Sequence, residues 1–450
     1  MAVTSATSSN ILQKRLDSLP LSKYYYKIWF LCTTGGVLDS LDLYLISFAL
    51  PMIAKDWGLS SEKIGILASA AMWGMLGGSY LWGYLSDRIG RKKSLINTVG
   101  IFSIITGLCA LAWNSWTLFI GRFAAGIGLG GFVPVSYTII TEIVPAKYRG
   151  RIAGAGVMLW PLGGLLGALI AYNLAPVWGW RSLFIVGALP ALLIFPLYTL
   201  IPESPRFLIS RGRVKEAAQV IRELEKKCNV PTAIPAELEI GAEETKAEPM
   251  KITELFSKDL LSRTLLASGI WFAFLLAYYG MMLWLPTLFV KYYHIPQAQT
   301  LKYMMLLTVL GIFGRAFGMS LVDSWGRKPV MISFAIAASL GILGYCGVKT
   351  TTQLITVAAI AAFFYEGMWA AVAPFTAEIF PTRVRSSGIG WSTGVGRISA
   401  ALSPMAVGFI VDYSLPAVFI TLSGLLFVMT VIISVFAFET KGKSLEEIAS

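Results

Sequence analysis

A short charged motif occurs twice in this chain, and its two copies lie half a chain apart. The first copy occupies 83–93 and the second occupies 320–328. Each is followed by a Glu-Ile-x-Pro motif with an arginine behind it, at 142–145 and at 378–381. The separations 323−87, 378−142, 381−145 and 385−149 all equal 236 residues. A register kept over four positions indicates two copies of one unit.

The repeated unit is a set of membrane-spanning helices. The 450 residues are 56% hydrophobic and 14% charged, with mean hydropathy +0.68, whereas a soluble domain carries about 25% charged residues. A helix needs roughly 20 apolar residues to span about 30 Å of hydrocarbon. Twelve such runs occur, centred near 27–53, 64–84, 94–113, 117–140, 153–173, 182–201, 265–289, 302–322, 330–348, 353–377, 387–411 and 416–437.

The sequence therefore predicts an all-α membrane protein with twelve transmembrane helices in two pseudo-symmetric six-helix bundles. Such duplicated architectures serve alternating access to a site between the halves. With the N-terminus inside, cytoplasmic segments hold 28 of the 37 Lys and Arg residues, external loops hold six and the spans hold three. Both termini are thus predicted to be cytoplasmic. This topology and anionic lipid account for the net charge of +12, so no nucleic acid is expected as a partner.

The polar stretch 204–264 separates the two halves. It opens on Ser204 and Pro205, which suit the N-cap and first position of a helix, and we expect one or two short helices followed by a Pro- and Glu-rich linker at 229–250. The first 26 residues contain no cleavable apolar segment, so the first span is expected to remain in the mature protein. The expected division is a cytoplasmic tail at 1–26, a bundle at 27–203, a cytoplasmic linker at 204–264, a bundle at 265–438 and a cytoplasmic tail at 439–450.

Three ionisable residues of the first half lie within predicted spans, where a charge is costly and points to function. Asp39 and Asp42 are three residues apart and share a helix face. At about 1.5 Å per residue, Asp42 lies roughly 23 Å from one membrane surface and Arg122 roughly 8 Å from the other, so the two can meet. We predict that protonating Asp42 releases Arg122 and couples a proton to transport, with Asp39 assisting proton or cation uptake. A static ion pair is the alternative for Asp42 and Arg122, and a purely structural role is the alternative for Asp39.

In the second half, Arg315, Glu366 and Arg397 fall near the middle of spans. A guanidinium binds a carboxylate through two hydrogen bonds, so Arg397 is the candidate for a substrate carboxylate. A salt bridge between Arg397 and Glu366 is the alternative, and Arg315 is expected to have a gating or structural role. Aromatic side chains suit a flat apolar ring held between them. The predicted substrate contacts are Arg397, Glu366, Tyr279, Trp284, Tyr137, Trp160 and Trp391.

The repeated motifs predict a cytoplasmic latch that stabilises the outward-open state. Anchoring by positive charge explains their basic residues but not the acidic residues at equal separation. The expected latch residues are Asp87, Arg88, Arg91, Glu142 and Arg149 in the first half, and Asp323, Arg327, Glu378 and Arg385 in the second. We find no metal-binding cluster, phosphate loop or nucleophile–base arrangement, so neither a metal, a cofactor nor enzyme activity is predicted.

These motifs resemble the major facilitator superfamily over nearly the whole chain, with 83–93 the most specific. The segments 121–128, 202–206 and 439–447 look like the branch that contains sugar porters, organic-ion transporters, synaptic vesicle glycoproteins and the metabolite–proton symporters. Within it, 278–286 and 394–397 look most like niacin and aromatic-acid symporters. The resemblance implies two six-helix bundles with the substrate at their interface. It also supports the assignment of Asp42 and Arg122, since proton-coupled sugar porters place an Asp–Arg pair at these motif positions.

The chain departs from the family pattern at several positions. No glutamine lies in the middle of a span, so a sugar would find few amide partners, and the antiporter motif of the fifth span is only approximated at 160–164. Glu366 is not expected from the resemblance and points to a different substrate. We therefore expect a monomeric proton symporter of the cell membrane for a small organic acid, of the nicotinate or aromatic carboxylate type. The partners are the substrate, protons and the lipid bilayer.

Two alternatives remain open from the sequence. One is a sugar or organic-cation carrier of the same superfamily. The other is a non-transporting receptor or scaffold that keeps the fold. The presence of both latches and of the Asp42–Arg122 pair argues against the receptor, because a protein that only binds has no need of a moving gate.

Overall fold

The computed structural model describes residues 5–231, 252–381 and 384–441, and this part of the chain forms helices without a strand. The first half comprises α1 (Ser5–Asp17), α2 (Lys23–Trp57), α3 (Ser61–Ile89), α4 (Arg91–Cys109), α5 (Ser115–Ile143), α6 (Ala146–Met158), α7 (Leu162–Trp178), α8 (Arg181–Val186), η1 (Leu189–Leu193) and α9 (Ile194–Leu200).

The segment between the halves contains short helices, and six further spans follow it. The short helices are α10 (Pro205–Ser210), α11 (Val214–Lys227) and η3 (Ile252–Phe256). The second half comprises α12 (Lys258–Lys291), α13 (Gln297–Trp325), α14 (Arg327–Gly344), η4 (Tyr345–Gly347), α15 (Thr351–Glu378), α16 (Arg385–Val411) and α17 (Leu415–Phe436).

Helices occupy all twelve predicted span positions. Among the described residues, ten helical segments are long and apolar enough to cross a membrane, and α4 and the α6–α7 pair fill the other two positions. The fifth span was expected to be one continuous helix, but it is broken. The helix stops at 159–161, where Pro161 has no N–H to donate. The sixth span is interrupted in the same way at η1, which contains Pro190.

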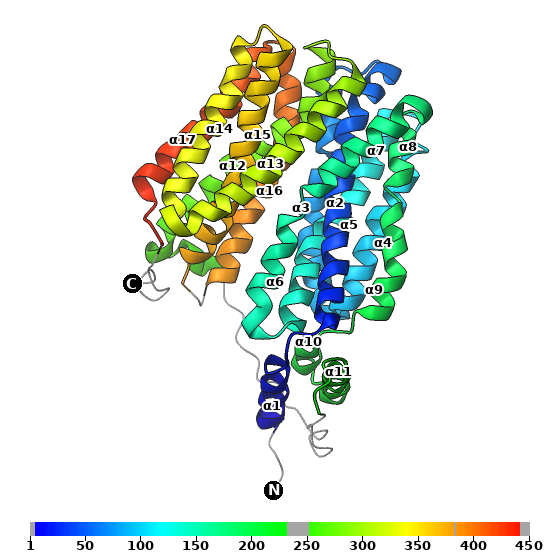
Figure 1. The fold of residues 1–450 in the computed structure, drawn as a ribbon, viewed down its shortest axis with the longest axis vertical. Helices are drawn as coiled ribbons and strands as arrows, with labels where there is room; N and C mark the ends of the chain where they lie inside the picture. Colours follow the sequence, from blue (N-terminus) through cyan, green and yellow to red (C-terminus); the bar gives the residue numbers. More distant parts are fainter. Residues whose placement is uncertain (1–4, 232–251, 382–383, 442–450) are drawn as a thin grey trace.

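The two halves pack alike, as duplication requires. In the first half α2 packs on α7 and α5 packs on both α3 and α4; in the second, α12 packs on α16 and α15 packs on both α13 and α14. Between the halves α3 meets α16 and α7 meets α13, two equivalent contacts that flank the contact of α2 with α12. Figure 1 shows the two bundles side by side. The predicted all-α fold of two six-helix bundles is confirmed.

We call the end of the molecule that carries α10 and α11 the motif end, because the repeated motifs lie there too, and the other the opposite end (Figure 1). At the opposite end the bundles are closed against each other. Asp412 accepts a hydrogen bond of 2.6 Å from the Ser61 hydroxyl, and Lys291 donates to the same hydroxyl at 2.6 Å. A Cβ added to Gly65 would lie 2.5 Å from the Pro404 carbonyl oxygen, so α3 and α16 touch backbone to backbone.

The N-terminal tail contains a helix that the sequence did not reveal. Leu12 and Leu16 of α1 are buried, and Arg15 forms an ion pair of 2.5 Å with the buried Glu225 of α11. The apolar face of α1 is short and becomes evident only when α11 covers it. The predicted N-cap of α10 is confirmed, since Ser204 accepts from the backbone N–H of Phe207. The linker predicted at 229–250 lies almost entirely outside the described residues.

Candidate functional site

Asp42 and Arg122 form a buried ion pair inside the first bundle. The guanidinium Nη2 lies 2.8 Å from one carboxylate oxygen of Asp42 and Nη1 lies 3.1 Å from the other. Both side chains are at most 1% exposed, and Thr106 of α4 accepts a further hydrogen bond from Nη1 at 3.2 Å. The two residues meet at one level, as their positions in the sequence predicted. The role of this pair in proton coupling remains a prediction.

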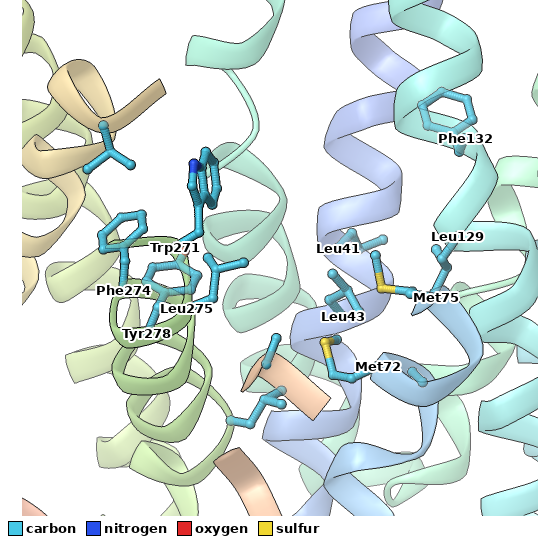
Figure 2. Packing of buried hydrophobic residues seen from close by; sticks show 14 of the residues in the cluster. Leu41, Leu43, Met72, Met75, Leu129, Phe132, Trp271, Phe274, Leu275 and Tyr278 are labelled. Carbon is cyan, nitrogen blue, oxygen red and sulfur yellow. The ribbon is translucent and has the colours of Figure 1, made fainter. Parts of the chain in front are cut away.

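A cavity with about 1380 Å³ of empty space lies between the bundles towards the motif end. We call it the motif-end cavity. Figure 2 shows that α12 presents Trp271 and Leu275 on one side, while α3 and α5 present Met75 and Phe132 on the other. Its charged lining residues are Asp39, Arg315 and Arg397, and its Tyr and Trp residues are Tyr137, Trp160, Trp271, Tyr279 and Trp369.

Asp39 is the acidic residue of this cavity. It is fully buried, and neither carboxylate oxygen has a hydrogen-bond partner among the described residues. Trp160 and Arg397 line the same cavity. An unpaired carboxyl beside a cavity is expensive, and a proton or a ligand can relieve that cost. Asp39 lies one helical turn from Asp42, which does not line the cavity.

Arg397 lies across the motif-end cavity on α16. The side chain is partly buried, and among the described residues it donates one hydrogen bond, of 3.5 Å, to the Met75 carbonyl oxygen of the other bundle. This contact is long, so most of the donor capacity of the guanidinium stays available to a ligand. Tyr279 and Trp160 line the same cavity. Three predicted substrate contacts are therefore brought together with Tyr137, whose side chain is half exposed at the cavity wall.

A second cavity, with about 780 Å³ of empty space, lies between the bundles towards the opposite end. We call it the opposite-end cavity. Its walls are mostly apolar and include Met281, Met282, Met304 and Leu307. The acidic group at its inner side is Glu366. Tyr44, Phe48 and Pro161 contribute the part of its wall that belongs to the first half.

Glu366 forms an ion pair, but its partner is Arg315 and not Arg397. Arg315 Nη2 lies 2.5 Å from Glu366 Oε2, and the Tyr278 hydroxyl donates to Oε1 at 2.8 Å. The side chains of Arg315 and Glu366 are 5% and 10% exposed. Helical spacing places all three charged residues of this half near the middle of their spans, but it does not say which helices are neighbours. The contact of α13 with α15 decides the pairing.

Two predicted substrate contacts lie away from both cavities. Trp284 is fully buried between α12 and α16, where its indole N–H donates to the Pro404 carbonyl oxygen at 2.8 Å. Trp391 packs edge-on against Phe256, with 5.1 Å between ring centroids. In this conformation both rings hold helices together, so the structure does not place them at a substrate site.

The repeated motifs form equivalent ion-pair clusters in the two bundles. In the first, Arg91 lies 3.1 Å from Glu142 and 2.8 Å from Asp87. In the second, Arg327 lies 3.0 Å from Glu378 and 3.5 Å from Asp323. The first cluster joins the α3–α4 connection to the end of α5, and the second joins the α13–α14 connection to the end of α15. Each cluster therefore lies within its own bundle.

The remaining predicted latch residues have other contacts. Arg149 binds Asp17 of α1 at 3.3 Å instead of an acid in its own motif, and Arg88 lies over the Tyr84 ring at 4.3 Å. Arg385 donates to the Phe380 carbonyl oxygen at 3.4 Å. The sequence could not reveal the contact of Arg149, because Asp17 belongs to the segment 1–26, which the sequence predicts to be a cytoplasmic tail.

Sequence reasoning missed two members of these clusters, Glu203 and Glu439. Glu203 accepts hydrogen bonds from the backbone N–H groups of Arg91 and Lys92, at 2.8 and 3.2 Å. Glu439 does the same for Arg327 and Lys328, at 3.0 Å each. The signal was present, because 439−203 is again 236.

Glu203 and Glu439 can approach the starts of α4 and α14 closely because a glycine precedes each helix. Gly90 and Gly326 have φ values of 101° and 107°, a region that residues with a side chain rarely adopt. A Cβ on either would lie within 2.6 Å of its glutamate. The glycines before α4 and α14 therefore give each carboxylate access to the first N–H groups of the helix.

Comparison with known proteins identifies relatives over almost the entire chain. A family model described as "Sugar (and other) transporter" matches residues 28–450. The chain is 31% identical over 439 residues to the niacin transporter NiaP of Acinetobacter baylyi, covering 97% of this chain and 99% of that protein. It is 31% identical over 428 residues to a gallate transporter of Pseudomonas putida, covering 91% of each.

Solved structures share the fold. The inward-open conformation of the xylose transporter XylE from E. coli matches with a TM-score of 0.74 at 20% identity, covering 94% of this chain and 99% of that chain.

Proposed function

Because this chain belongs to the sugar (and other) transporter family of the major facilitator superfamily, we propose that it is a proton-coupled symporter for a small aromatic or heteroaromatic carboxylate. That it is a multi-pass membrane transporter and not an enzyme follows from the family. The substrate class, the coupling ion and the orientation are the proposal.

The observation that carries the proposal is the composition of the motif-end cavity. It combines one partly buried guanidinium, on Arg397, with the flat side chains of Trp160, Trp271, Tyr279 and Trp369. A carboxylate suits the guanidinium, and an aromatic ring gains contact area and favourable stacking between the aromatic side chains. A sugar would need several amide and hydroxyl partners, and the described residues that line this cavity offer hydroxyl groups but no Asn or Gln amide. The names of the relatives, niacin and gallate transporters, agree with a carboxylate.

Proton coupling is assigned to Asp42 and Arg122. While Asp42 is ionised, its two hydrogen bonds to Arg122 hold α2 to α5. Protonation removes the charge that the guanidinium binds, which loosens this contact and allows the helices to move. Asp39 lines the cavity one turn away on the same helix, so it is positioned to carry protons between the cavity and Asp42.

The motif end is assigned to the cytoplasm, since it carries the dense Lys and Arg content of the chain. The closed contacts of Ser61, Lys291 and Asp412 at the opposite end, together with the motif-end cavity, then correspond to an inward-facing state. In this state each cluster at the motif end makes its ion pairs within its own bundle. When the bundles swing together at the motif end, the two clusters would meet and hold that end closed.

Uptake into proteoliposomes tests the proposal. With an imposed inward proton gradient, the protein should accumulate nicotinate or benzoate, and a protonophore should abolish the accumulation. Xylose and tetraethylammonium should not be accumulated. Accumulation of either of these in place of the carboxylates would overturn the substrate class, and carboxylate binding without any flux would favour a receptor.

A further inference from the structure

One buried ion pair of the second half lies in the wall between the two cavities. Arg315 lines the motif-end cavity, and Glu366 lines the opposite-end cavity. Their side chains meet at 2.5 Å with almost no exposure. The motif-end cavity is therefore in contact with Arg315 and the opposite-end cavity with Glu366. The ion pair between these two residues spans the wall that separates the cavities.

The surroundings of Arg315 are those of an anion site. Its guanidinium lies 5.7 Å from the centroid of the Trp369 ring, and both residues line the motif-end cavity together with Trp271. A ring carrying a carboxylate would find an aromatic face and a cation at this place. The carboxylate of Glu366 is already bound to the Arg315 guanidinium, so a ligand carboxylate must compete with Glu366 for it.

We propose that Arg315 is a second carboxylate-binding residue of the transport site and that Glu366 is its internal substitute ligand. This rests on the proposed function and assigns a route to its substrate. In the empty cavity Glu366 binds Arg315. When a substrate carboxylate binds Arg315, Glu366 leaves and takes up one proton, since an unpaired carboxylate in an apolar cavity is costly. When the substrate departs, Glu366 releases the proton and binds Arg315 again.

The groups that face Glu366 fit this exchange. They are Arg315 from α13, Tyr278 and Tyr279 from α12, Tyr44 from α2, and Tyr365 on its own helix. Arg315 is the one cation among them. Tyr278 already donates to the carboxylate at 2.8 Å, and its hydroxyl can also accept from a protonated Glu366. The neutral form thus keeps a hydrogen bond after Arg315 has turned to the substrate.

Ligand binding to the purified full-length protein tests the exchange. The probes are nicotinate and nicotinamide, which share the ring and differ in the charge of the substituent. Glu366→Gln removes the competing charge and keeps the shape of the side chain. We expect the Kd for nicotinate to fall by about tenfold or more, because a charge-assisted hydrogen bond no longer has to be broken. The Kd for nicotinamide should not change.

Two further measurements complete the test. Wild-type affinity for nicotinate should rise as the pH falls from about 8 to 5, and most of this rise should disappear in Glu366→Gln. Arg315→Gln in the Glu366→Gln background should abolish the gain. If Glu366→Gln does not fold, Tyr278→Phe loosens Glu366 by one hydrogen bond and should shift the Kd for nicotinate in the same direction by a smaller factor.

The outcomes are distinguishable. Glu216→Gln, on the exposed surface of α11, serves as a matched control and should change nothing. If Glu366→Gln leaves the Kd for nicotinate unchanged, or changes the Kd for both ligands equally, the exchange is wrong, whereas proton-driven transport of nicotinate by the wild-type protein still upholds the proposed function. If the wild-type protein binds and transports neither nicotinate nor benzoate, the proposed function fails as well.

Discussion

Glu203 and Glu439 occupy the same place in the two bundles, and each carboxylate accepts backbone N–H groups from the first two residues of a helix. Those donors have no partner within their own helix, and the positive end of the helix dipole favours a negative charge there. The carboxylates thereby fasten the end of each bundle, after α9 and after α17, to the start of its third span.

We predict that Glu203→Gln and Glu439→Gln destabilise the protein to a similar extent. Each replaces charge-assisted hydrogen bonds by neutral ones at a partly buried helix start, which should cost about 1–2 kcal/mol. Thermal unfolding in detergent measures this loss. Glu216→Gln is the control, because its pairing with Arg213 is exposed. A large effect at one glutamate and none at the other would contradict the equivalence of the two halves.

Asp42→Asn should separate transport from coupling. The substitution keeps the shape of the side chain but removes the charge that Arg122 binds, so proton-driven accumulation should fall strongly, with any remainder coupled through Glu366, while exchange of labelled for unlabelled substrate persists. Uptake and counterflow in the same proteoliposomes measure the two activities. Asp56→Asn, near the end of α2 and bonded to the Trp180 indole, is a matched control expected to retain accumulation. Full gradient-driven uptake by Asp42→Asn would rule out the coupling role.

Arg397→Gln should weaken binding of carboxylates selectively. Loss of a charge-assisted contact to the substrate should raise the Kd for nicotinate by roughly tenfold or more, with little change for nicotinamide. Isothermal titration of both ligands checks the selectivity. Lys349→Gln, in the loop between α14 and α15, removes a positive charge from the surface and serves as the control. Equal weakening of both ligands would show that Arg397 supports the fold of the cavity rather than the carboxylate.

Glycine at the crossing of α3 and α16 should control closure of the opposite end. A Cβ at Gly65 would lie 2.5 Å from the Pro404 carbonyl oxygen, so Gly65→Ala should force the bundles apart there. An impermeant maleimide reacting with a cysteine at Met304, in a background free of native cysteines, reports that opening. Labelling should become several-fold faster. Gly77→Ala lies on the same helix with nothing within 4 Å of the added carbon, and should label like the parent.

Asp412 should favour the closed opposite end over the whole physiological pH range. Burial acts to raise its pKa, but hydrogen bonds from Ser61 and Tyr292 and the charge of Lys291 outweigh burial and lower the pKa below its ordinary value. A carboxyl with a lowered pKa in the closed form favours closure above its ordinary pKa, and this contribution is lost only as the pH falls through the lowered value.

The thiolate fraction of any cysteine rises with pH, so the labelling rate of the Met304→Cys reporter is divided by that of a free thiol at the same pH. Asp412 should contribute no pH dependence to this ratio between about 5 and 8. Asp412→Asn should speed labelling throughout this range. Labelling that slows or stays unchanged in Asp412→Asn would show that the contact with Ser61 does not hold the end closed.

The sequence by itself determined the membrane spans, their number and their duplication. Apolar runs of sufficient length have one stable form in a bilayer, because every backbone polar group must be bonded within the segment. The separation of 236 residues shows that Arg91 and Arg327 are equivalent. The same separation relates Glu203 to Glu439, so their equivalence could also have been predicted. The meeting of Asp42 with Arg122 could be predicted because depth along a helix follows from residue count.

Only the tertiary structure decided which side chains share a cavity. Residue count gives the level of a side chain in the membrane, but neither the rotation of its helix nor the neighbour that it faces. For that reason Glu366 pairs with Arg315 instead of Arg397, and Trp284 is buried against Pro404 instead of lining a cavity. These choices follow from contacts between helices far apart in the sequence, and no local pattern of residues encodes them.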